Sequence, residues 1–238
     1  MVSLKDKVII MTGASGGIGG STAKLLAAKG AKVVIGSNDV TALQKLEGEI
    51  KAQKGQVVSM ELDVTSEDQV KAFIDLAQKT YGTVDILINF AGLTAHGAIT
   101  DLTEAQFDTV MDVNVKGVFL ATKHFVPLVD IEKGAQIINF GSMASKRPNA
   151  FAPQYCAAKA AVNLLSQGLA LQLKDKNIKV TTLNPGPTNT TFFAAGRPVP
   201  REKFMEASDV AEVIEFILTR ESRVVFHDVA FESHLFFK

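Results

Sequence analysis

Seven short apolar runs, separated by longer stretches with helix signals, constrain the fold of this chain more than any other feature. The runs are almost entirely apolar, whereas a strand with one face in water alternates apolar and polar residues. Both faces of each strand should therefore be buried, as in a parallel sheet that helices cover on both sides. Because strands and helices alternate along the whole length, the chain should build βαβ units with right-handed crossovers. The expected strands are Lys7–Thr12, Ala31–Gly36, Gln56–Leu62, Asp85–Asn89, Ala135–Phe140, Lys179–Leu183 and Arg223–Phe231.

The intervening stretches carry recognisable helix boundaries. Capping boxes at Ser66–Gln69 and Thr103–Gln106 each precede spaced apolar residues, and Gly30 stands where a helix ends. A length of 238 residues suits one large domain and is short for two. The sequence therefore predicts a single doubly wound α/β domain over residues 1–238, with a seven-stranded, mostly parallel sheet and helices on both faces.

The composition argues against several kinds of partner. Lys plus Arg and Asp plus Glu both number 25, so the formal net charge is zero and no basic field is available to hold nucleic acid or an anionic membrane. No apolar run approaches the length of a membrane span, and the first residues lack the apolar core of a signal peptide. Cys156 is the one cysteine, which suits a reducing compartment. We expect a cytoplasmic protein.

A glycine-rich turn follows the first expected strand, in Thr12-Gly13-Ala14-Ser15-Gly16-Gly17-Ile18-Gly19. Glycines let the chain turn sharply and let a pyrophosphate approach the backbone, while the N-terminus of the next helix points free N–H groups at the phosphates. The spacing is Gly-xxx-Gly-x-Gly, and not the commoner Gly-x-Gly-x-x-Gly. Taken alone, the motif leaves open a tight strand–helix turn without a ligand.

Polar and turn-forming residues also follow the later strands. Asp63-Val64 ends the third expected strand, Asn89-Phe90-Ala91-Gly92 ends the fourth, Ser142 follows the fifth and Pro185-Gly186 follows the sixth. The carboxyl ends of parallel strands meet at one edge of the sheet, where open α/β folds bind their ligands. This shared edge favours a dinucleotide site over an empty turn.

Tyr155 and Lys159 begin a helical stretch and are four residues apart, which places them on one helix face. A phenol titrates at about pH 10, and a lysine ammonium beside it, together with a cationic nicotinamide ring, favours the phenolate. Tyr155 would then exchange a proton with a substrate oxygen near neutral pH, and Ser142 would hydrogen-bond the same oxygen. The alternative is an ordinary half-buried aromatic residue, because such pairs also arise by chance. Cys156 points off the shared face and is expected to be a packing residue.

Together these motifs resemble those of the short-chain dehydrogenase/reductase family, and the resemblance covers nearly the whole chain. It implies a Rossmann fold in which Tyr155 is the general acid/base and Lys159 is its electrostatic partner and a ligand of the nicotinamide ribose. It implies that Ser142 orients the substrate carbonyl. It also implies that Asn114 kinks a helix and holds a water of the proton relay, the alternative for Asn114 being a purely structural helix break. The matching residues are Thr12–Gly19, Asp63, Asn89–Gly92, Asn114, Ser142, Tyr155–Lys159 and Pro185-Gly186.

The resemblance further indicates which residues contact the cofactor, and no metal is expected. The expected contacts are Gly13, Ser15, Gly17, Ile18, Gly19, Ser37, Asn38, Asp63, Val64, Asn89, Ala91, Gly92, Tyr155, Lys159, Pro185, Gly186, Thr188 and Thr190.

The choice between NADP(H) and NAD(H) depends on the end of the second strand. An NAD site needs a carboxylate at this position, which accepts hydrogen bonds from the ribose hydroxyls. The same carboxylate repels a 2′-phosphate. Ser37 is neutral, and Ser37 and Asn38 can both donate hydrogen bonds to a phosphate. We therefore expect NADP(H). Its specificity should be modest, because Gly16 and Asn38 stand at the two positions where an NADP site usually carries a basic residue. The alternative is an NAD(H) site in which the side chain of the nearby Asp39 turns inward.

Two positions depart from the family pattern. Phe90 replaces the usual second Asn after the fourth strand, which puts local packing in question more than catalysis. The last expected strand, Arg223–Phe231, is not followed by the Gly-rich segment that many relatives use in tetramer contacts. We expect a homodimer or a homotetramer, with a dimer formed through the helices over Thr103–Val126 and Tyr155–Leu173.

Segment 184–206 is irregular and rich in Pro, Gly and Phe, and the resemblance makes it a lid over the substrate. Phe192, Phe193 and Phe204 would favour an apolar or mixed substrate, or else would pack an interface. His96 lies near the expected substrate mouth, as a contact or as a solvent-facing loop residue.

These features predict an oxidoreductase that transfers a hydride reversibly between a nicotinamide cofactor and a small carbonyl or secondary alcohol substrate. One alternative is a dinucleotide-binding regulator without turnover, which would have lost a catalytic residue, whereas Asn114, Ser142, Tyr155 and Lys159 are all present. Another is an epimerase or dehydratase acting on a nucleotide-sugar, but those relatives usually carry a larger C-terminal substrate domain.

Overall fold

The computed structural model describes residues 1–193 and 199–237. Within them, seven strands form one sheet in the order β3-β2-β1-β4-β5-β6-β7, and every neighbouring pair is parallel. From β1 the strand order runs outward to β3 on one side, and from β4 it runs outward to β7 on the other, so the order reverses between β1 and β4. In such sheets, ligands bind at this switch point, outside the carboxyl ends of the strands. The predicted doubly wound α/β fold is confirmed. The strands are β1 (Val8–Thr12), β2 (Lys32–Ser37), β3 (Gln56–Glu61), β4 (Ile86–Asn89), β5 (Ala135–Phe140), β6 (Ile178–Pro185) and β7 (Asp228–Phe231).

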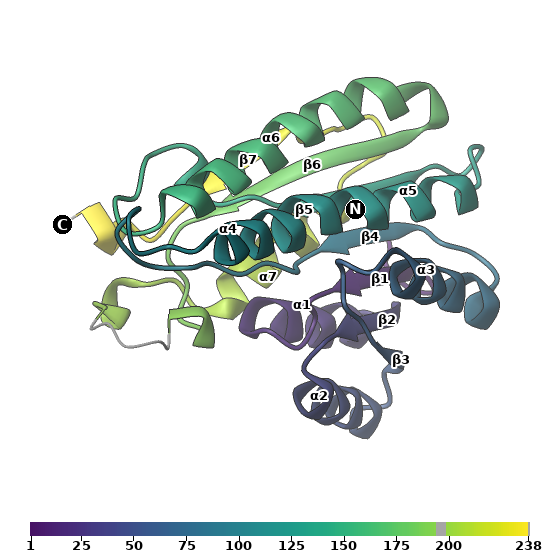
Figure 1. Cartoon of the computed structure of the whole chain (residues 1–238). Coiled ribbons are helices and arrows are strands. Elements are labelled where there is room, and N and C mark those ends of the chain that lie inside the picture. The colour runs from purple at the N-terminus through teal and green to yellow at the C-terminus, as the bar shows by residue number, and fades with distance from the viewer. Residues whose placement is uncertain (194–198, 238) are drawn as a thin grey trace.

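Helices cover both faces of the sheet (Figure 1). One buried cluster joins α1, α2 and α7 to one face, and a second joins α3, α5 and α6 to the other. The long helices are α1 (Gly17–Ala28), α2 (Val40–Ala52), α3 (Glu67–Tyr81), α4 (Glu104–Met111), α5 (Gly117–Phe125), α6 (Pro153–Leu173) and α7 (Ala207–Leu218). The short turns are η1 (Asp112–Lys116), η2 (Val126–Leu128), η3 (Met143–Ser145), η4 (Lys174–Lys176), η5 (Thr191–Phe193), η6 (Arg201–Lys203) and η7 (His234–Phe237).

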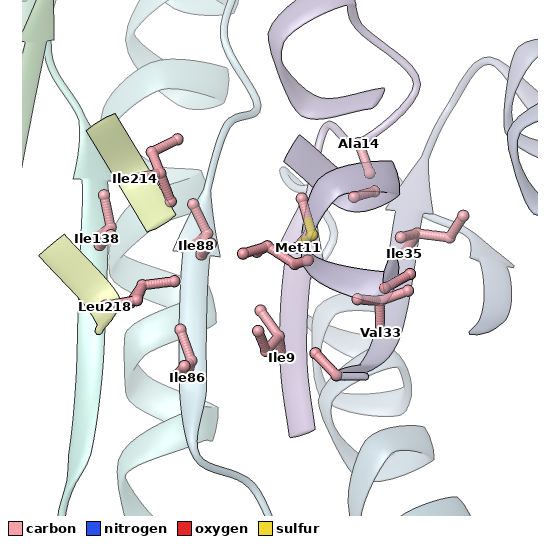
Figure 2. Close-up of a cluster of buried hydrophobic side chains, with 14 of the residues drawn as sticks. Ile9, Met11, Ala14, Val33, Ile35, Ile86, Ile88, Ile138, Ile214 and Leu218 are labelled. Atoms are coloured by element: carbon pink, nitrogen blue, oxygen red, sulfur yellow. The ribbon is translucent and has the colours of Figure 1, made fainter. Parts of the chain in front are cut away.

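The two clusters explain why the strands read as unbroken apolar runs. Successive side chains of a strand point to opposite faces. Ile9 and Met11 of β1 point into the first cluster, where Ile214 and Leu218 of α7 also lie (Figure 2). Ile10, between them in the sequence, belongs to the second cluster. Every position of β1 is therefore buried, as the sequence predicted.

The last strand is shorter than its apolar run suggested. β7 covers Asp228–Phe231, whereas the predicted strand began at Arg223. Before Asp228 the chain still passes β6, but side chains of β6 take its carbonyl groups. Lys179 Nζ donates to one of them at 3.0 Å and the Thr181 hydroxyl to another at 2.7 Å. Side-chain hydrogen bonds thus replace the backbone ladder at Val224 and Phe226, whereas the His227 carbonyl still accepts a hydrogen bond from the Thr182 N–H.

Helices begin where the capping boxes predicted. The Ser66 hydroxyl accepts a hydrogen bond from the Gln69 N–H at the start of α3, and Thr103 and Gln106 bond reciprocally at the start of α4. α4 continues through η1, a π-helical turn, into α5, so the expected irregularity at Asn114 occurs within one helical rod. Among the described residues, no helix is both long and apolar enough to cross a membrane.

Candidate active site

A cleft of about 820 Å³ lies along the carboxyl edge of the sheet, between the glycine turn after β1 and the first turn of α6. It brings together residues from six strand ends and from α6. The predicted site residues that line it are Gly13, Ser15, Gly17, Ile18, Gly19, Ser37, Asn38, Asp63, Val64, Ala91, Gly92, Ser142, Tyr155, Lys159, Pro185, Gly186, Thr188 and Thr190.

Asn89 is the predicted cofactor residue that the fold places elsewhere. Its side chain is buried at the end of β4, and its Nδ2 donates to Asn139 Oδ1 on β5 at 2.8 Å. Asn139 Nδ2 in turn donates to the Ser166 hydroxyl on α6 at 2.9 Å. This buried row ties β4, β5 and α6 together beneath the cleft, and the three residues after Asn89 face the cleft in its place.

The glycine turn has the geometry that a pyrophosphate needs. Gly13 has a φ of 64°, and a Cβ there would lie 2.5 Å from the Ala91 backbone nitrogen, so only glycine fits. α1 begins at Gly17 with Gly16 as its N-cap, and its first turn carries no side-chain cap and no acidic residue. The N–H groups of this turn and the positive end of the helix dipole therefore face the cleft. A dinucleotide fits this cradle.

At the end of β2, hydroxyl and amide groups line the cleft. The Ser37 and Ser15 hydroxyl oxygens are 2.5 Å apart, and Asn38 is exposed beside them. Asp39 is bound differently, because its carboxylate accepts a hydrogen bond from the Ala42 N–H at 3.0 Å as the N-cap of α2. The inward turn of Asp39 that would favour NAD(H) is not the conformation found.

Tyr155 and Lys159 lie one turn apart on α6 and meet the end of β5. The Ser142 side chain lies beside the Tyr155 phenol and acts to lower its pKa. Lys159 Nζ lies 5.6 Å from the centroid of the Tyr155 ring and donates to the Phe140 carbonyl oxygen at 2.8 Å. The fold thus joins Ser142 to the Tyr–Lys pair that sequence spacing placed on one helix face.

Burial governs the titration of both α6 groups. It raises the pKa of Tyr155 to about 12, although the Ser142 side chain acts in the opposite direction. It lowers the pKa of Lys159 to about 7. The protein side chains alone therefore do not favour the phenolate, contrary to the expectation drawn from the spacing. Tyr155 keeps its proton at neutral pH and is equipped as a proton donor.

Asn114 is buried within the π-helical turn η1, beside Lys159. Its Nδ2 donates to the Leu93 and Val110 carbonyl oxygens, both at 2.8 Å, while its Oδ1 has no hydrogen-bond partner among the described residues. A side chain at Gly92 would lie 2.8 Å from that oxygen and 3.2 Å from Lys159 Nζ. The Asn114 oxygen and the lysine therefore border one small space that Gly92 leaves clear.

Asn184, which no sequence pattern singled out, holds the turn that carries Ser142. Its Oδ1 accepts hydrogen bonds from the Ser142 N–H at 2.8 Å and from the Ser145 hydroxyl at 3.1 Å. Its Nδ2 donates to Asp228 at 2.8 Å, and Asp228 forms an ion pair with Lys146. Asn184 is fully buried, so these bonds fix the backbone of Ser142 without competition from water.

Phe90, the departure from the family pattern, forms an aromatic pair with Phe140. Their ring centroids are 4.6 Å apart, and both residues line the cleft. Phe140 also supplies the carbonyl that accepts the Lys159 hydrogen bond. The aromatic pair packs the floor between the ends of β4 and β5, so the local packing is intact without the usual Asn.

The ends of the predicted lid segment 184–206 meet at its base. Thr188 and Met205 form an isolated bridge, and the Asn189 N–H donates to the Met205 carbonyl at 2.7 Å. The Phe192 ring lies 5.7 Å from the Tyr155 ring, so the start of the segment reaches Tyr155. The Phe193 side chain and residues 194–198 lie outside the described residues.

Several residues of the cleft were missed by sequence reasoning, among them three with large side chains. These three are Arg147, Phe151 and Phe236. His96 also lines the cleft and is exposed, which agrees with both of its interpretations and does not decide between them. Phe236 lies in η7, beyond the last strand. Its signal in the sequence is the apolar run Leu235-Phe236-Phe237, which follows the polar residues Glu232-Ser233-His234.

Comparisons with known proteins agree with this geometry. The family model described as short chain dehydrogenase matches residues 7–199. An uncharacterized oxidoreductase of Staphylococcus aureus is 34% identical over 229 residues, covering 96% of this chain and 98% of the relative. Another, from Staphylococcus saprophyticus, is 33% identical over 230 residues, with the same coverage of 96% and 98%.

Solved structures give the same answer. An alcohol dehydrogenase from the archaeon Thermococcus sibiricus, complexed with 5-hydroxy-NADP, has a TM-score of 0.89 at 27% identity and covers 97% of this chain and 98% of its own. A dehydrogenase/reductase from Sinorhizobium meliloti has a TM-score of 0.88 at 29% identity and covers 96% and 94%. These coverages leave no large part of either structure without a counterpart in this chain.

Proposed function

The chain belongs to the short-chain dehydrogenase family and is an oxidoreductase, and from this premise we propose that it interconverts carbonyl compounds and secondary alcohols with a nicotinamide cofactor. The observation that carries the proposal is the Tyr155 phenol, which lies beside Ser142 and Lys159 in the same cleft as the glycine turn. A proton donor and a dinucleotide cradle in one cleft suit hydride transfer coupled to proton transfer.

The glycine turn, Ser37, Asn38 and Lys159 would hold the cofactor, and the bound nicotinamide would supply or accept the hydride. In reduction, Tyr155 donates its proton to the substrate oxygen as the carbon receives the hydride. Ser142 donates a hydrogen bond to the same oxygen and so orients the carbonyl. The Lys159 ammonium stabilises the negative charge that Tyr155 acquires. Asn114 would hold a water that returns a proton to this pair.

We propose NADP(H) as the preferred cofactor. Ser15, Ser37 and Asn38 offer uncharged donors where the 2′-phosphate would lie, and the Asp39 carboxylate is engaged as a helix cap. An uncharged site lacks charge-assisted hydrogen bonds, so the preference over NAD(H) should be modest. The archaeal alcohol dehydrogenase of similar structure was solved with an NADP derivative, which supports the same choice.

A homodimer through α4, α5 and α6 completes the proposal. These helices lie together on one face of the sheet (Figure 1). They expose Phe107, Phe119, Leu164 and Leu171, large apolar side chains that a second copy would cover. We further propose a single catalytic domain over residues 1–238, with segment 184–206 closing over the substrate, in a cytoplasmic enzyme as its single cysteine suggests.

The absorbance of the reduced nicotinamide, followed with a panel of ketones, aldehydes and alcohols, tests the function. Oxidation of the cofactor that requires both a carbonyl compound and Tyr155 is the expected result. Tight cofactor binding, measured by fluorescence, without turnover of any panel member would instead favour the non-catalytic regulator.

A further inference from the structure

Three aromatic rings from separate parts of the chain line the cleft beyond Tyr155. Phe151 precedes α6, Phe192 follows β6 and Phe236 lies in η7. These three residues, here called the aromatic wall, remain 52%, 37% and 38% exposed, so much of their ring surface is available to a bound molecule. The Phe192 ring lies 5.7 Å from the Tyr155 ring, which places the wall next to the proton donor.

Phe236 is held in the wall by the loop that follows Ser142. The Arg147 guanidinium carbon lies 5.7 Å from the centroid of the Phe236 ring, and Arg147 forms an ion pair with Glu232. The Glu232 side chain is only 7% exposed, and it packs so closely on Gly186 that a side chain there would collide with it. On another side, the Phe204 ring lies 6.3 Å from Phe236.

The charge of this region is balanced. Arg147 lines the cleft near the aromatic wall, and its counter-ion Glu232 lies behind it. A buried carboxylate bonded to the guanidinium cancels most of the field that would attract an anionic substrate. The surface offered to a substrate is therefore aromatic and close to neutral.

We propose that the enzyme prefers uncharged ketones that carry an aromatic or similarly bulky apolar substituent, and that Phe236 is a specificity-determining residue that contacts this substituent. The inference rests on the proposed carbonyl reductase function. It adds to that function a substrate contact from the segment after β7, in a position that the catalytic motifs do not specify.

Two uncharged ketones of different size test the role of Phe236. The measured quantity is the ratio of kcat/KM for acetophenone to kcat/KM for butanone. The parent should favour acetophenone, and Phe236→Ala should lower the ratio about tenfold or more, because the phenyl group loses its apolar partner. Phe236→Leu should fall between them. Leu235→Ala, a change at an exposed neighbour outside the cleft, is the matched control and should keep the parent ratio.

A charged analogue tests the balance between Arg147 and Glu232. The parent should reduce acetylbenzoate, which adds a carboxylate to acetophenone, less efficiently than acetophenone itself. Glu232→Gln removes the counter-charge, so the relative kcat/KM for acetylbenzoate should rise about tenfold. A parent that prefers acetylbenzoate would overturn the proposed substrate class.

The outcomes separate this inference from the function on which it rests. If the parent reduces both uncharged ketones and Phe236→Ala leaves their ratio unchanged, the wall assignment is wrong while the reductase function stands. If the parent binds the cofactor but reduces no carbonyl compound, both the proposed function and this inference are wrong. Circular dichroism of each variant confirms that the fold is retained.

Discussion

The Lys159 ammonium lies 5.6 Å from the centroid of the Tyr155 ring, one turn along the same helix. Both groups are desolvated, which raises the pKa of Tyr155 to about 12 and lowers that of Lys159 to about 7. At neutral pH, Tyr155 therefore keeps its phenol proton, whereas Lys159 releases its ammonium proton at a pH of about 7.

Tyr155→Phe should lower the turnover number by about 10²- to 10⁴-fold, because it removes only the transferable proton. The ring and its contact with Phe192 remain, so the dissociation constant of the reduced cofactor should stay near the parent value. Stopped-flow absorbance and fluorescence titration measure the two quantities. Near-parent turnover by the variant would contradict the role of Tyr155.

Lys159 should make stability depend on pH between about 7 and 9. Its pKa is about 7 when folded and 10.5 in its ordinary state, so in this window the unfolded chain binds the additional proton. The free energy of unfolding must then rise with pH. Urea unfolding at several pH values should show this rise in the parent and lose it in Lys159→Met. Lys24→Met, which changes an exposed lysine on α1, is the control. A rise with pH that persists in Lys159→Met would disprove the assignment.

Ser37→Asp should move the cofactor preference toward NADH by about tenfold or more, because a carboxylate repels the 2′-phosphate and bonds ribose hydroxyls. Ser37→Asn introduces a side chain of the same shape as aspartate but without its charge, so it should keep the cofactor preference of the parent. The measurement is kcat/KM for NADPH and NADH with one ketone. A parent that clearly favours NADH, together with an unmoved Asp variant, would place the choice elsewhere.

Asn184→Ala should lower kcat by about 10- to 100-fold, because the Ser142 backbone loses the acceptor that fixes it and misplacement of a catalytic group is costly. Lys146→Met removes only the outermost, exposed ion pair of the same chain of contacts, so its effect should be small. Both variants should bind the cofactor as the parent does. Equal kcat values in Asn184→Ala and the parent would exclude a positioning role.

Local sequence patterns predicted most of the fold and much of the lining of the candidate site, for physical reasons. The apolar runs located the inner strands because both of their faces are buried. Tyr155 and Lys159 are four residues apart, so helix geometry alone places them on one face. The start of β7 was missed because an apolar run does not reveal that Lys179 and Thr181 side chains take the backbone carbonyls beside it.

The rest of the site depends on contacts between distant residues. Asn184 and Ser142 are 42 positions apart, and Arg147 and Glu232 are 85 apart, so no local motif marks either pair. Asn89 was placed in the cleft because it ends a strand, but its side chain turns to Asn139 in the neighbouring strand. The strength of burial at Tyr155 likewise emerges only once α6 packs against the end of β5.

The position of β7 at the edge of the sheet has a consequence for local stability. β7 has four residues, pairs only with β6, and is nowhere fully buried, whereas the glycine turn follows the central strand β1. Edge segments of this kind open at a lower free energy than the global unfolding of the protein, and they exchange their amide hydrogens sooner. Warming or mild denaturant should therefore loosen the segment around Phe236 first. The enzyme would lose its discrimination among substrates while it still binds its cofactor.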